Sequence, residues 1–211
     1  MRPSPPRSVT ELAALRAHYL EQPDRAHALL APVHTALAPL LNADQESEFG
    51  IELGLFFIEL CLETRRFSGG WPVIGQLVKW NLRGAAPHRQ ALLQALLARG
   101  LVSQGRLEEA LPELDRALQL GQRNNEALAL GYAHMALGPF ASRQEDGERA
   151  VEHLREALNL LQRSGDDGPW AQVYAALCVS LRKHASPATR TALLEEGKQV
   201  LLAQRRWAEA A

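Results

Sequence analysis

A segment of this chain recurs after 40 residues, and this repeat constrains the fold more than any other feature of the sequence. Residues 108–120 and 148–160 are identical at six of 13 positions. The same offset relates positions that stay mostly apolar along the chain: one such column reads His34, Ile74, Leu114, Leu154, Leu194. Self-similarity with a period of 20–50 residues is typical of repeat architectures. Five periods of 40 residues would take up nearly all of the 211-residue chain.

Composition favours helices as the content of each repeat. Leucine and alanine make up 70 of the 211 residues, whereas valine, isoleucine and threonine together number only 17. Leucine and alanine lose little entropy in a helix, and β-branched residues lose more. Between residues 108 and 120 the small and apolar side chains recur at helical spacing along one face. An all-α protein is therefore expected, with no sheet.

Turn residues divide each repeat into two helices. Gly105 separates the two helices of one pair, expected at 89–103 and 106–120. Gly121 and Asn124–Asn125 mark a break after the second of them. Gly138–Pro139 predicts an early helix end and a loop to about residue 146. Prolines inside second helices predict kinks or shortened helices; they are Pro32, Pro39 and Pro112. First helices are expected near 9–21, 48–65, 89–103, 126–138 and 169–183, and second helices near 24–41, 72–83, 106–120, 147–163 and 188–205.

The second-helix pattern resembles that of tetratricopeptide repeats. It consists of Gly105, Leu107, Ala110, Leu114, Ala117 and Leu120, and three of its positions recur as Ala150, Leu154 and Ala157. The sequence departs from the family where Gln94 stands at the usual tryptophan and in its period of 40 rather than 34. The resemblance implies a right-handed α-solenoid of about five antiparallel helix pairs, with these small residues packing the pairs. It would form one domain over 9–207, after a disordered tail at 1–8, with repeats near 9–41, 48–83, 89–121, 126–163 and 169–205.

Such an array implies a binding function. One helix pair cannot bury its own apolar face, so pairs stack into a superhelix with a concave surface that holds a peptide or a partner helix. We therefore expect a non-catalytic protein-interaction or scaffolding module. The alternatives are the effector-sensing arm of a bacterial transcription or signalling regulator and, more weakly, a hydrolase that uses scattered groups such as His134, Glu59 and Arg99. A homodimer is also compatible with a repeat array.

The family's groove positions, carried over from repeat to repeat, give the expected binding surface. They would run from an acidic end through an apolar centre to a basic end, an arrangement that can orient an extended ligand. These residues are Glu52, Leu55, Glu59, Glu63, Arg99, Tyr132, Met135, Arg143, Gln172, Arg182 and Lys183. Ser142 and Arg143 are expected in a loop. The charged residues are taken as exposed, so that reversing Glu59 or Arg182 should change stability by only about ±0.5 kcal/mol.

Other functions lack support in the sequence. A net charge of −1 does not suit a phosphate-binding nucleic-acid partner. The most apolar stretch, residues 51–62, is too short to span a membrane and contains two glutamates. His27 and His34 lie about 10 Å apart along one helix, too far to share a metal without other ligands. Cys61 and Cys178 form no disulfide framework and fit a reducing compartment. We expect a cytoplasmic protein without a metal or an organic cofactor.

Overall fold

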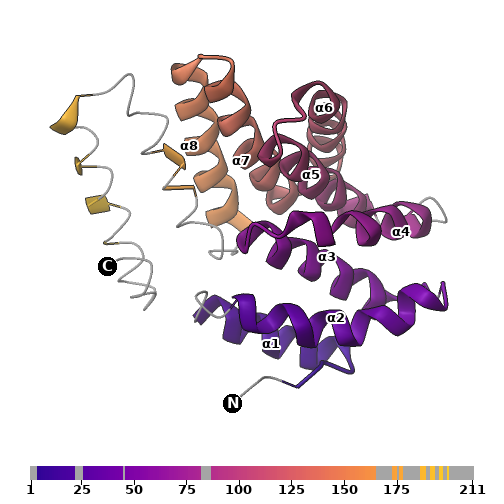
Figure 1. Ribbon diagram of the computed structural model, residues 1–211. Helices are drawn as coiled ribbons and strands as arrows, with labels where there is room; N and C mark the ends of the chain where they lie inside the picture. The colour runs from indigo at the N-terminus through magenta and orange to yellow at the C-terminus, as the bar shows by residue number, and fades with distance from the viewer. Residues whose placement is uncertain are drawn as a thin grey trace. The chain divides into compact units, whose positions relative to one another are not determined.

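The computed structural model is all-α over the residues that it describes (Figure 1). These are residues 4–21, 26–44, 46–81 and 87–164, together with short pieces between 173 and 199. They contain eight α-helices and one short 3-10 helix, and no strand occurs among them. The all-α class predicted from the sequence is therefore confirmed for this part of the chain. The chain divides into two compact units, unit 1 (residues 1–86) and unit 2 (residues 87–211), which are described separately.

Unit 1 is organised around one buried helix. Its elements are α1 (Val9–Glu21), α2 (Ala26–Asn42), α3 (Glu48–Glu63), the 3-10 helix η2 (Phe67–Gly69) and α4 (Trp71–Asn81). α3 packs against all the others, and every residue from 53 to 61 within it is buried. This run is apolar apart from Glu59 and includes two phenylalanines, as expected for a helix enclosed on several sides. Ser47 starts α3, because its hydroxyl accepts a hydrogen bond from the Gly50 N–H.

The turn after α2 is tied to α4 by a tryptophan. Trp80 is fully buried, and its indole N–H donates a 2.8 Å hydrogen bond to the Asp44 carboxylate. The Gln76 side-chain amide donates to the same carboxylate oxygen. Asp44 itself lies in the left-handed region with φ 47°, a conformation that aspartate tolerates better than most residues. The turn that follows α2 thus supplies the polar partner of the buried indole on α4.

Unit 2 contains two helical hairpins. They are formed by α5 (Pro87–Ser103) with α6 (Leu107–Asn124) and by α7 (Ala127–Arg143) with α8 (Gly147–Ser164). α7 also packs against both α5 and α6, so the first helices of the two hairpins are neighbours. The turn after α5 uses Gly105 at φ 80°, as the sequence predicts, and the turn after α6 uses Asn125 at φ 53°.

The recurring small residues lie inside these hairpins. Each of the six positions singled out by the repeat is fully buried: Ala110, Leu114, Ala117, Ala150, Leu154 and Ala157. Alanine at these positions lets the backbones of two packed helices approach closely, while the leucine between them supplies apolar area to the core. The sequence repeat therefore corresponds to a repeated buried column on α6 and α8.

Two glycines that the sequence assigns to helix ends lie inside helices instead. α6 continues through Gly121 to Asn124, and α7 continues through Gly138 and Pro139 to Arg143. A Cβ at Gly121 would lie 2.8 Å from Leu130, and one at Gly138 would lie 2.4 Å from Leu154. These glycines are needed for close packing rather than for a turn, so the predicted early ends are wrong.

Proline does not shorten the helices that contain it. α2 runs through Pro32 and Pro39, and α6 runs through Pro112, with lengths of 17 and 18 residues. A proline removes one backbone hydrogen bond, and tertiary packing can outweigh that loss. Of the two outcomes expected at these prolines, kinks or shortened helices, shortening does not occur, and the other helix limits agree within a few residues. The helices expected at 169–183 and 188–205 fall mainly outside the described residues.

Replacing Ala150 with leucine should loosen the α7–α8 hairpin. Ala150 is fully buried, so three extra carbon atoms would have to displace the neighbouring helix. We expect a loss of about 1–3 kcal/mol in the free energy of unfolding. Urea titration followed by circular dichroism measures this loss. Val151→Leu on the same helix, at a half-buried position, is the matched control, and equal behaviour of the two variants would contradict the packing role.

Candidate binding surface

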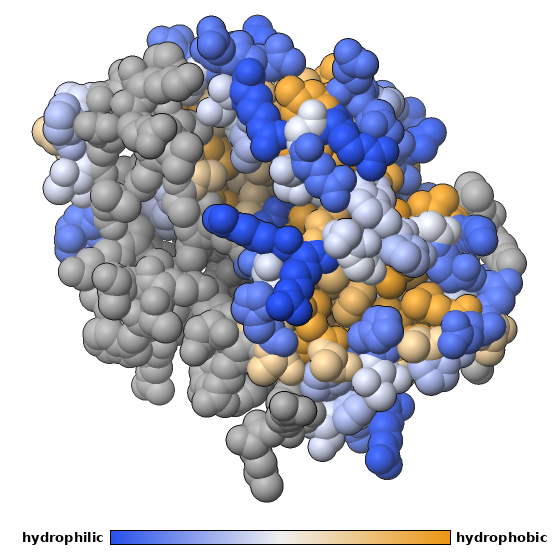
Figure 2. Space-filling view, viewed as in Figure 1, coloured by the Kyte–Doolittle hydropathy of each residue, from blue (hydrophilic) through white to orange (hydrophobic). Residues whose placement is uncertain are grey.

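The groove positions expected on α3 are only partly accessible. Leu55 and Glu59 are buried, with 1% and 5% of their surfaces exposed, whereas Glu52 and Glu63 are half-buried. Apolar residues show at the surface of unit 1 among hydrophilic ones in Figure 2. Of the four groove positions on α3, Glu52 and Glu63 are therefore the ones that retain surface for a partner.

Glu59 forms an ion pair inside unit 1. Arg16 Nη2 on α1 donates hydrogen bonds to both Glu59 carboxylate oxygens, at 2.6 and 2.8 Å. The Arg16 guanidinium also lies 5.6 Å from the centre of the Phe56 ring, within range of a cation–π interaction. The pair joins α1 to α3, so the expectation that Glu59 is an exposed groove charge is wrong.

The groove positions of unit 2 lie on α5 and α7. Tyr132 and Met135 are buried, with 3% and 5% exposed, and the Arg99 guanidinium lies 5.7 Å from the centre of the Tyr132 ring. Arg99 is half-buried, so it presents part of its side chain at the surface. The structure thus brings Arg99 on α5 and Tyr132 on α7 together across the two first helices.

Arg143 has a second role at this surface. It is the last residue of α7 rather than part of a loop, and Ser142 is helical as well, which corrects the sequence prediction. Its guanidinium donates to the carbonyl oxygen of Val102 and, at 3.4 Å, to that of Ser103. Those carbonyls belong to the last turn of α5, and the Val102 carbonyl also accepts a 3.0 Å hydrogen bond from the Gly105 N–H. Arg143 therefore binds the first helices of successive hairpins together while remaining exposed.

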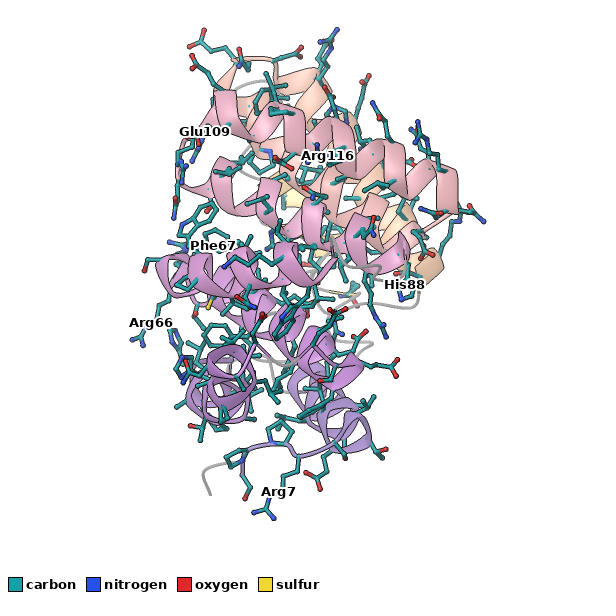
Figure 3. The ribbon with its side chains drawn as sticks, turned by 90° about the vertical axis from the view of Figure 1, so that its right-hand side faces the viewer. Arg7, Arg66, Phe67, His88, Glu109 and Arg116 are labelled. Atoms are coloured by element: carbon teal, nitrogen blue, oxygen red, sulfur yellow. The ribbon has the colours of Figure 1, made fainter. Side chains whose placement is uncertain are left out.

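The expected charge gradient is only partly described. Glu52 and Glu63 belong to unit 1, whereas Arg99 and Arg143 belong to unit 2. The remaining groove residues, Gln172, Arg182 and Lys183, lie outside the described residues. Within unit 2, strongly hydrophilic residues cover the upper part in Figure 2, and Glu109 and Arg116 on α6 are labelled in Figure 3. The described groove positions of unit 2 that reach the surface are thus Arg99 on α5 and Arg143 on α7, and we call this surface the α5–α7 face.

Sequence reasoning missed a pair of histidines between α7 and α8. His134 and His153 approach with their Nδ1 atoms 3.3 Å apart, and their rings are inclined by 61°. Burial is the main cause that lowers the pKa of each imidazole, and the charge of His153 lowers the pKa of His134 further. Both rings are therefore neutral near pH 7, and a hydrogen bond between them needs a proton on only one Nδ1.

The repeat itself carries a signal for this pair. Forty residues earlier, Gln94 and Glu113 occupy the equivalent positions on α5 and α6. Gln94 Oε1 and Glu113 Oε2 are buried oxygens for which no hydrogen-bond partner occurs in the described structure, although Arg116 lies 3.8 Å from that glutamate oxygen. Each hairpin of unit 2 thus places two polar side chains at the same level of an otherwise apolar helix pair. An alignment of the repeats that included polar as well as apolar columns could have identified the histidine pair.

Acidification should weaken unit 2 through these histidines. Each folded-state pKa lies below the ordinary value of about 6.5, so the unfolded chain binds protons more readily. The associated stability is complete above pH 6.5 and is lost as the pH falls through the folded-state pKa values. We expect the unfolding temperature to fall between pH 7 and pH 5, and to fall less in the double variant His134→Gln/His153→Gln. EDTA is present in these measurements to remove trace metal ions. His27→Gln/His34→Gln, which removes two exposed histidines, should retain the parent's pH dependence.

Within the described residues, no three or more His, Cys, Asp or Glu side chains are grouped so that they could hold a metal ion. No described helix has both the length and the apolar character needed to cross a membrane. No protein-family model matches the sequence, and no curated protein matches it significantly.

Proposed function

We propose that this chain is a non-catalytic binding module, similar to tetratricopeptide repeats, that holds a peptide or partner helix on its first helices. The observation that carries the proposal is the repeated construction of unit 2. Its two hairpins have the same buried column on their second helices, and their first helices, α5 and α7, are neighbours. Stacking of equivalent hairpins is how repeat proteins extend a continuous binding surface.

The α5–α7 face has the chemistry of a peptide-binding surface. Arg99 presents a half-buried cation that lies against the buried Tyr132 ring, and arginine is enriched among the residues that contribute most of the binding energy at interfaces. Arg143 adds a second positive charge where α5 ends. An extended peptide or an amphipathic helix with acidic residues would complement these charges. The overall charge of −1 favours a protein partner over a nucleic acid.

Site-specific photo-crosslinking tests where the partner binds. A photoreactive amino acid at Ser103, which is exposed at the end of the first helix α5, should capture one protein in the native cell. The same amino acid at Arg116 is the matched control, because this residue is exposed on the second helix α6 (Figure 3). Capture from Ser103 but not from Arg116 supports the proposal, and equal capture from both sites, or from Arg116 alone, contradicts it.

Affinity measurements then separate binding at this face from indirect capture. The purified partner should bind Ser103→Trp at least about tenfold more weakly than the parent, since a bulky side chain at an interface prevents close packing. Arg116→Trp should bind like the parent. Unchanged affinity of Ser103→Trp would exclude the α5–α7 face as the binding surface.

A further inference from the structure

The geometry of the histidine pair points to a metal site: we propose that His134 and His153 form a two-histidine clamp for a divalent transition metal, of the Zn²⁺ and Cu²⁺ class, between α7 and α8. This site is separate from the α5–α7 face and does not depend on the proposed function. Water would complete the coordination.

The separation of the two nitrogens matches what a metal requires. Imidazole nitrogens bind zinc at about 2.0–2.1 Å, so two ligands at a tetrahedral angle are roughly 3.3–3.4 Å apart. The Nδ1 atoms of His134 and His153 are 3.3 Å apart. Binding would displace the one proton that the two Nδ1 atoms share, and each ring would then carry its proton on Nε2.

Two imidazoles with oxygen ligands suit Zn²⁺ and Cu²⁺, and the Irving–Williams order predicts that Cu²⁺ binds more tightly. Ca²⁺ and Mg²⁺ prefer oxygen ligands and should not bind.

Titration of the purified full-length chain with ZnCl₂ and CuCl₂ tests the clamp. We expect one equivalent to bind and to raise the unfolding temperature, because the metal binds the folded hairpin and joins its two helices. His134→Gln/His153→Gln should lose at least about tenfold in affinity, since even outer-shell changes at metal sites cost about 10–100-fold. His27→Gln/His34→Gln removes the same number of histidines from α2 and should bind like the parent. MgCl₂ should leave the unfolding temperature unchanged.

Several results would overturn the clamp. They are the absence of metal binding, an equal loss in both double variants, or binding that His134→Gln/His153→Gln retains. If that variant fails to fold, the parent protein still decides the question by histidine-selective NMR. Substoichiometric ZnCl₂ must then shift the imidazole resonances of His134 and His153 before those of His27 and His34, and the reverse order would exclude the site.

Discussion

Replacing Glu59 with lysine should destabilise unit 1 by about 3–5 kcal/mol, the usual cost of leaving one member of a buried ion pair without its partner. Only 5% of Glu59 is exposed, and its carboxylate accepts two hydrogen bonds from Arg16. A lysine would place a second cation beside the guanidinium, at a position that has almost no access to water. Urea titration followed by the fluorescence of Trp71 and Trp80, both in unit 1, measures the loss in a Trp170→Phe/Trp207→Phe background.

The reciprocal change and a charge-free pair make this prediction sharper. Arg16→Met should also be costly, because the buried carboxylate loses its partner, whereas Arg16→Met/Glu59→Leu should lie much closer to the parent. Glu46→Lys, at an exposed position before α3, should stay within about ±0.5 kcal/mol. A comparably small effect for Glu59→Lys would show that the ion pair contributes nothing to stability.

The helix order of this chain could be predicted from its sequence because the determining signals are local. A 40-residue period, apolar residues at helical spacing and turn residues such as Gly105 placed the eight described helices in their order and most of their limits within a few residues. Errors arose where a residue has both a local and a tertiary role. Gly138 before Pro139 has the local pattern of a helix end, but its role depends on Leu154, which contacts it from the next helix.

The candidate site was harder to predict, because exposure and partners depend on residues far along the chain. Glu59 has the helical position of a groove residue, but it is buried and forms an ion pair with Arg16, which lies 43 residues earlier in the sequence. His134 and His153 are 19 residues apart, and no metal or catalytic motif has that spacing. They meet because a helix, a tight turn and a second helix bring them to the same level of a hairpin.

Replacing Gly138 with alanine should lower the free energy of unfolding of unit 2 by about 3 kcal/mol or more. Overpacking usually costs about 1–3 kcal/mol, and this substitution belongs at or above the upper end of that range. The new Cβ would lie 2.4 Å from Leu154 Cγ, and Leu154 is fully buried, so neither side chain can move into solvent. Position 138 also precedes Pro139 inside α7, where a Cβ conflicts with the proline ring in the helical conformation. Thermal and urea unfolding, followed by circular dichroism, measure the effect.

A second glycine and a second-site change separate the causes of this loss. Gly75 lies inside α4, and a Cβ added there would have no neighbouring atom within 4 Å, so Gly75→Ala should stabilise the protein by about 0.5–1 kcal/mol, as alanine does in an open helix. Leu154→Ala removes the atoms that block position 138, at a cost of about 2–5 kcal/mol. Gly138→Ala/Leu154→Ala should then cost less than the sum of the two single changes, because the collision disappears while the conflict with Pro139 remains. Strict additivity would mean that Leu154 does not limit the size of residue 138, and that the proline alone requires glycine there.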